Sequence, residues 1–86
     1  MTSGGAEAED HGARRALGEA VRALRRRAGL SREELAARVG LDAAAISQIE
    51  AGEADPTWGD SRRIAAALGT SVDRLAELVE ELEGES

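Results

Sequence analysis

Hydrophobic residues recur every three or four positions through most of the chain, which is the spacing of amphipathic helices. The pattern predicts five helices, over 13–28, 32–39, 43–51, from Thr57 to Leu68, and over 72–83. The connections between them are short, and no second domain or internal repeat is visible. We therefore expect an all-α fold, a compact five-helix bundle.

Side chains that can cap helices mark these boundaries. Ser31 is followed three residues later by Glu34, the pattern of a capping box. Three more of the predicted helix starts have a side chain that can accept a hydrogen bond from the first turn: Asp42, Thr57 and Ser71. Glycine, which adopts a left-handed conformation at little cost, follows three of the helices at Gly29, Gly40 and Gly69.

The segment 32–51 carries most of the functional information. Small or apolar residues stand where two short helices must pack: Leu35, Ala36, Val39, Leu41, Ile46 and Ile49. With Gly40 in the turn, this is the layout of a DNA-binding helix-turn-helix, whose second helix enters the major groove. The outward residues of that second helix are Ala43, Ala44, Ser47, Gln48 and Ala51, and none is positively charged.

The first twelve residues lack periodicity and large apolar groups, so we expect a disordered acidic tail over 1–12 and a folded domain over 13–83. No apolar run approaches the roughly 18 residues of a membrane span, and the N-terminus lacks a signal-peptide core. With no cysteine there is no disulfide or zinc finger, and a cytoplasmic location is expected.

The net charge of −6 is opposite in sign to a general affinity for nucleic acids, but it is unevenly distributed. Residues 13–40 carry +5, whereas 1–12 carry −3, 41–69 carry −3 and 70–86 carry −5. The molecule could present one basic face to phosphates and have an acidic surface on the opposite side. The alternative is that the arginines only decorate a solvated helix.

Nothing in the sequence indicates an enzyme, a cofactor or a metal site. The single histidine, His11, falls in the expected tail, where nothing rigid could position it. The pairs Glu33–Glu34 and Glu80–Glu81 are adjacent in sequence and indicate solvated helix faces. No phosphate-binding glycine loop or metal-ligand spacing is present.

The fourth and fifth helices raise two further expectations. Trp58 begins the inward stripe of the fourth helix, and we expect it in the core, covering the joint with the third helix. The fifth helix has an apolar stripe longer than a small core requires. Its last members could pack back on the first helix or form a two-fold dimer contact, and we favour a homodimer through Leu78, Val79 and Leu82.

Four ordered segments resemble the phage-repressor/Cro helix-turn-helix family, also called the Xre family. They are LGEAVRALRRRAGLS (17–31), REELAARVGL (32–41), AISQIEAGEADPT (45–57) and RRIAAALGTSVDRL (62–75), about two-thirds of the chain. The resemblance implies a repressor-like domain whose base-reading positions are Ala43, Ala44, Ser47 and Gln48. It implies phosphate contacts at Arg32 and Thr57, and a pairing of Arg25 with Glu50 that ties the first helix to the third.

The chain also departs from the family pattern. Arg32 stands where the family usually has glutamine, and its charged fork suits a phosphate. Glu53 and Asp55 lie in the turn where phosphates should approach, and each opposes binding. Gln48 can bond adenine through two hydrogen bonds, although it could also be an ordinary exposed residue.

These observations predict a sequence-specific, repressor-like transcriptional regulator that binds double-stranded DNA. The third helix would lie in the major groove, and a dimer would bind an inverted repeat with half-sites about one helical turn apart. The alternative is a protein-interaction module on the same fold, such as an antitoxin or a regulatory adaptor. The uncharged third helix and the acidic turn favour that alternative.

Overall fold

A computed structural model describes residues 3–85, with the side chains of 12–84. Five helices follow one another: α1 (Ser3–Arg27), α2 (Arg32–Val39), α3 (Ala43–Glu50), α4 (Trp58–Ala67) and α5 (Val72–Glu85). The described residues contain no strand. The predicted all-α, five-helix fold is therefore confirmed.

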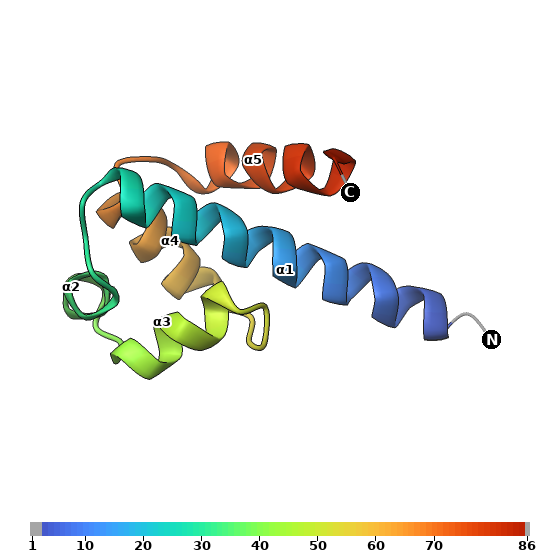
Figure 1. Ribbon diagram of the computed structural model, residues 1–86, viewed down its shortest axis with the longest axis horizontal. Coiled ribbons are helices and arrows are strands. Elements are labelled where there is room, and N and C mark those ends of the chain that lie inside the picture. The colour runs from blue at the N-terminus through green and yellow to red at the C-terminus, as the bar shows by residue number, and fades with distance from the viewer. Residues whose placement is uncertain (1–2, 86) are drawn as a thin grey trace.

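The long helix α1 organises the other four (Figure 1). Helix α5 runs alongside α1 in the opposite direction, while α2 and α3 lie on the other side of α1. The first half of α1 extends beyond the rest of the molecule. This arrangement separates α3 from α5, so the faces that these two helices expose are different surfaces.

The core is formed where the first four helices meet. Its most deeply buried large side chains come one from each of them: Val21, Leu35, Ile46 and Ile64. The predicted inner faces of the α2–α3 pair are confirmed, since Leu35, Ala36, Val39, Ile46 and Ile49 are buried and Leu41 is half-buried. Each buried Leu or Ile contributes about 1.5–3 kcal/mol.

The caps predicted from the sequence form as hydrogen bonds. At the start of α2, the Glu34 amide donates to Ser31 Oγ (3.0 Å) and the Ser31 amide donates to Glu34 Oε1 (2.8 Å). The hydrogen bond from the Ser31 amide, with a smaller contribution from the Ser31 hydroxyl, holds the pKa of the Glu34 carboxyl below its usual value. The Ala45 amide donates to Asp42 Oδ1 (2.8 Å) at the start of α3. Between α2 and α3, Gly40 adopts the left-handed conformation with φ +75°.

Helix α1 begins earlier than the sequence predicts. It starts at Ser3, so residues 3–12 are helical where a disordered tail was expected, and residues 1–2 lie outside the described part. Once a helix is nucleated by its packed half, each further residue adds a hydrogen bond at small cost. The segment contains no proline to stop it, and its Ala and Glu residues favour helix.

The prediction that Trp58 lies in the core is wrong. Its side chain is 68% exposed, although Ile64 and Ala65 on the same helix are buried. Because Thr57 caps α4, Trp58 is the first residue of the helix and stands at the rim, beyond the reach of the core. It lies beside Val72 and Leu75 of α5 and does not cover the joint between α3 and α4.

Helix α5 packs on α1 within the single chain. Leu75 is buried, and Leu78, Val79 and Leu82 are half-buried. Packing back on the first helix, one of the two alternatives for these residues, is therefore what the monomer shows.

Candidate nucleic-acid interface

The outer face of α3 is smooth and uncharged. Ala44 and Gln48 are exposed, Ala43 and Ser47 are half-buried, and no arginine or lysine belongs to the helix. Ala43, Ala44 and Ser47 line a shallow groove of about 370 Å³ together with Arg32 of α2. The structure thus brings three of the predicted base-reading residues next to a predicted phosphate contact. Gln48 lies one helical turn beyond Ala44.

Glu50, at the end of α3, joins three helices through two arginines. Arg25 of α1 donates from Nε to Glu50 Oε2 (2.6 Å) and from Nη2 to Oε1 (3.2 Å). Arg32 of α2 donates from Nε to Oε1 (3.0 Å). Arg25 also donates from Nη1 to the Leu30 carbonyl (2.8 Å). The Arg25–Glu50 pairing implied by the family resemblance is present, and Arg32 adds a second cation to it.

This ion network stays charged although it is largely buried. Burial raises the pKa of Glu50, but the hydrogen bonds and charges of Arg25 and Arg32 outweigh that effect and leave the pKa below its ordinary value of 4.5. The hydrogen bond to Glu50 raises the pKa of Arg25. A buried charge that lost its partner would be costly, so the network fixes how α1, α2 and α3 sit against each other.

Arg32 keeps part of its binding capacity in this arrangement. Its side chain is 42% exposed, and the bond to Glu50 uses only Nε. Among the described residues, neither Nη of Arg32 has a hydrogen-bond partner. The guanidinium is therefore oriented by Glu50 while both outer nitrogens can still donate to a phosphate.

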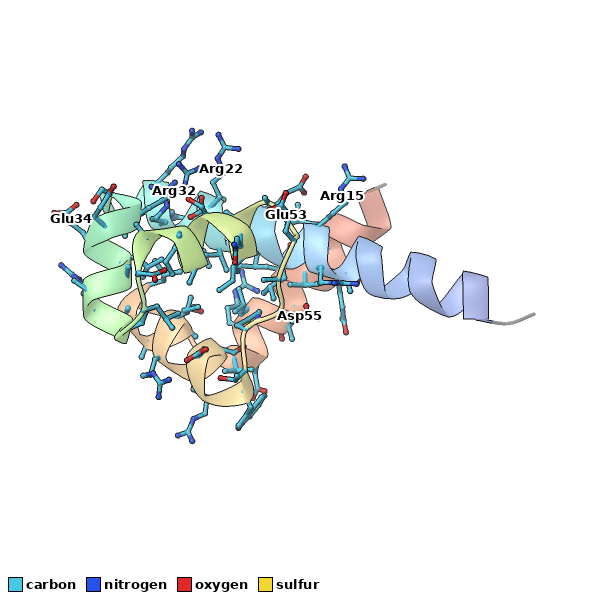
Figure 2. The ribbon with its side chains drawn as sticks, turned by 90° about the horizontal axis from the view of Figure 1, so that it is seen from below. Arg15, Arg22, Arg32, Glu34, Glu53 and Asp55 are labelled. Carbon is cyan, nitrogen blue, oxygen red and sulfur yellow. The ribbon has the colours of Figure 1, made fainter. Side chains whose placement is uncertain are left out.

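A close approach of α1 to α3 adds two arginines that the sequence reasoning did not single out. Gly18 lies against the end of α3, where an added Cβ would be 2.5 Å from the carbonyl oxygens of Ile49 and Glu50. Arg15 and Arg22 flank Gly18 on the same helix and are exposed. In Figure 2 both lie along the same edge of the molecule as Arg32. The sequence did contain a signal for them. Arg15, Gly18 and Arg22 are spaced three and four positions apart, which places them on one face of α1.

The two acids of the turn after α3 have different surroundings. Glu53 lies along the arginine edge, whereas Asp55 lies away from it (Figure 2). The Asp55 carboxylate is 3.8 Å from Arg14 Nε. Of these two acids, Glu53 is therefore the one that remains beside the candidate interface as an unfavourable charge, and Glu33 adds another in the groove next to Arg32.

Thr57 is placed by its capping role. It is exposed, and its Oγ1 accepts a hydrogen bond from the Asp60 amide (3.0 Å). Since the hydroxyl acts as acceptor in that bond, its own hydrogen remains able to donate to a phosphate oxygen.

Other kinds of site find little support in the described part of the chain. No group of three histidine, cysteine or acidic side chains there could hold a metal ion. No helix of residues 3–85 combines the length and the apolar character needed to cross a membrane. The side chain of His11 lies outside those described.

Comparisons with known proteins agree with this geometry. The family model described as "Helix-turn-helix domain" matches residues 16–78. The crystal structure of the clp gene regulator ClgR from Corynebacterium glutamicum is similar, with a TM-score of 0.81 and 26% sequence identity over 84% of this chain and 77% of that chain. No curated protein matches the sequence significantly. The chain belongs to the helix-turn-helix domain family and is an Xre-like DNA-binding protein.

Proposed function

We propose that the protein is a sequence-specific, repressor-like transcription regulator that inserts α3 into the major groove. The observation that carries this proposal is the placement of charge. In a chain of net charge −6, Arg15, Arg22 and Arg32 lie together along the edge beside α3. The likeness to ClgR, a gene regulator, supports the same role.

The proposed contacts divide into base reading and phosphate binding. Gln48 would bond adenine, and the methyl groups of Ala43 and Ala44 would contact thymine methyls, with Ser47 adding one hydrogen bond. Arg32 and Thr57 would hold phosphates, as the family resemblance implies. To these we add Arg15 and Arg22, which supply the positive charge that α3 lacks.

The small number of cations limits affinity. Each neutralised phosphate contributes about −0.9 to the slope of log K against log salt, so three arginines give roughly −3 per protomer before the opposing charge of Glu53. Such a protomer binds weakly alone. Two protomers on an inverted repeat would double the slope, and for this reason we propose a dimer as the binding form.

One side of α5 suits the proposed dimer contact. A groove of about 500 Å³ between α1 and α5 is lined by Leu78 and Leu82. Its charged lining residues are Arg27, Arg74 and Glu81, so a two-fold related copy could set unlike charges against each other. Val79, the third residue of the predicted contact, lines a different groove on the other side of α5.

Selection of bound sequences from random duplex DNA, followed by band-shift titration at increasing salt, tests the proposal. We expect enrichment of an inverted repeat with half-sites about one helical turn apart, and binding that weakens steeply with salt. Absence of any binding at low salt by the folded protein would refute it.

The second candidate is a protein-interaction module on the same fold, such as an antitoxin or regulatory adaptor. The uncharged outer face of α3 and the neighbouring Glu53 favour it. Recovery of a stoichiometric protein partner, with no DNA enriched in the selection above, would support this reading over the first.

A further inference from the structure

A second groove lies on the other side of α5 from the candidate dimer contact. It has a volume of about 430 Å³ between α1, α4 and α5, and its apolar lining includes Leu17, Val72, Leu75 and Val79. Trp58 stands at its edge, 68% exposed. Trp58 is the one large hydrophobic side chain that is exposed among those described, and no element of the chain covers it. We call this surface the Trp58 groove.

The charges around the Trp58 groove are mainly negative. Arg14 and Asp55 lie in its wall and offset each other at 3.8 Å. Glu80 and Glu83 are exposed on the α5 side, and neither has an ion-pair partner among the described side chains. The groove is thus apolar in its floor and acidic along one rim.

The wall also contains an unsatisfied donor. Arg14 Nε is buried without a hydrogen-bond partner in the described part of the chain.

Charge decides which occupant fits. DNA is excluded because the rim would repel its phosphates. A two-fold related copy seated here would set the acidic rim of Glu80 and Glu83 against its own equivalent. A positively charged segment with an apolar face satisfies the floor, Trp58 and the rim together, in the manner of a helix lying in a groove.

We propose that the Trp58 groove binds an amphipathic segment of a partner protein whose apolar side chains are flanked by arginine or lysine. Trp58 is the anchor of this contact, and Glu80 and Glu83 select the positive charge. Glu80 and Glu83 lie on α5, on the opposite side of α1 from α3, whereas Trp58 adjoins Thr57 of the proposed DNA contacts. The inference does not depend on DNA binding and goes beyond the regulator role proposed above.

A synthetic helical peptide of about four turns, free of tryptophan, with leucines on one face and arginines on the other, is the probe. Trp58 is the only tryptophan in the chain, so its fluorescence reports on the groove directly. We expect a saturable blue shift of the emission with the basic peptide. A peptide with the same leucines and with glutamates in place of arginines should give no shift.

Matched variants locate the binding. Glu80→Gln combined with Glu83→Gln should weaken the basic peptide roughly three- to tenfold. Glu81→Gln is the control, because Glu81 is on the same helix but lines the other groove, and it should change binding less than twofold. Trp58→Ala, followed through a fluorescent label on the peptide, should weaken binding at least tenfold, in the range of about 10–30-fold for an aromatic anchor. Since Trp58 is exposed, the thermal midpoint of the Trp58→Ala variant should match that of the parent protein.

Several results would overturn the proposal. The first is binding of the acidic peptide as tight as that of the basic peptide. The second is weakening by Glu81→Gln as large as that by the combined Glu80→Gln and Glu83→Gln variant. The third is binding of the basic peptide that Trp58→Ala leaves unchanged. Concentration-dependent self-association that buries Trp58 in the free protein would instead assign the groove to a second copy. Band shifts of the Glu80→Gln, Glu83→Gln variant on the selected DNA keep the two proposals apart, since both residues lie on α5 and DNA binding should be unchanged by these substitutions whatever the peptide does.

Discussion

Replacing Gly18 with alanine tests the contact that holds α1 against α3. The added Cβ would lie 2.5 Å from the carbonyl oxygens of both Ile49 and Glu50, whereas ordinary contact begins at 3.4 Å. Both obstacles are backbone atoms and cannot rotate away. The two helices would therefore have to separate by about 1 Å, close to the Arg25–Glu50 hydrogen bonds.

Two opposing effects determine the size of the change. Alanine is favoured over glycine inside a helix by about 1 kcal/mol, whereas overpacking costs about 1–3 kcal/mol. Since two backbone carbonyls block the methyl group, we expect the upper end of that cost and a net loss of about 2 kcal/mol in the free energy of unfolding. Gly12→Ala is the matched control, because it lies in the same helix with nothing within 4 Å of its added Cβ. It should gain up to about 1 kcal/mol.

Thermal unfolding followed by circular dichroism measures the difference. A gap of about 3 kcal/mol between the two variants corresponds to roughly 12–24 °C in a domain of this size. Gly18→Ala should also weaken DNA binding at a temperature where it is folded, because it moves Arg15 and Arg22 relative to α3. If Gly18→Ala proved as stable as Gly12→Ala, the described contact between α1 and α3 would be wrong.

Four further substitutions test the interface and its support. Gln48→Ala should relax sequence preference in a selection experiment more than it lowers overall affinity, and equal enrichment of the same site would contradict a base-reading role. Arg32→Ala and Arg22→Ala should each weaken binding to all sequences and reduce the salt slope by about one per site. Glu50→Gln should cost about 3–5 kcal/mol by leaving Arg25 buried without its counter-charge, as measured by urea unfolding. The pKa of Glu50 is lowered in the folded state, so its ionised form contributes to the free energy of unfolding above pH 4.5, and this contribution is lost as the pH falls through the lower folded value. The parent should therefore lose stability in acid, and the Glu50→Gln variant should lose less.

The helix boundaries were predictable because their signals are local. Ser31 and Glu34 are three residues apart and satisfy each other's backbone, so the start of α2 can be read from four residues. Asp42 and Thr57 give a similarly local signal, since each side chain accepts a hydrogen bond from the amide three residues later. The start of α1 was missed because the segment before Ala13 has no such signal, and a helix continues by propagation until something stops it.

The site was less predictable because its contacts are distant in sequence. Arg32 and Glu50 are 18 positions apart, and only the crossing of α2 and α3 brings them together. Gly18 appears in the sequence as a weak helix residue, and its role depends on carbonyls at the end of α3. Trp58 was misplaced because helical periodicity gives the direction of a side chain but not where along the helix the core ends.

The smooth outer face of α3 has a consequence for how this protein could change its target. The side chains of Ala44 and Gln48 are exposed and make no described hydrogen bond or ion pair, while the fold depends on Ile46, Ile49 and Glu50 on the other side of the helix. Larger polar side chains at these exposed positions would meet solvent or DNA and leave the core intact. With α3 reading bases as proposed, single substitutions at these positions would change operator preference at little cost in stability, which makes the domain a suitable starting scaffold for engineered DNA specificity.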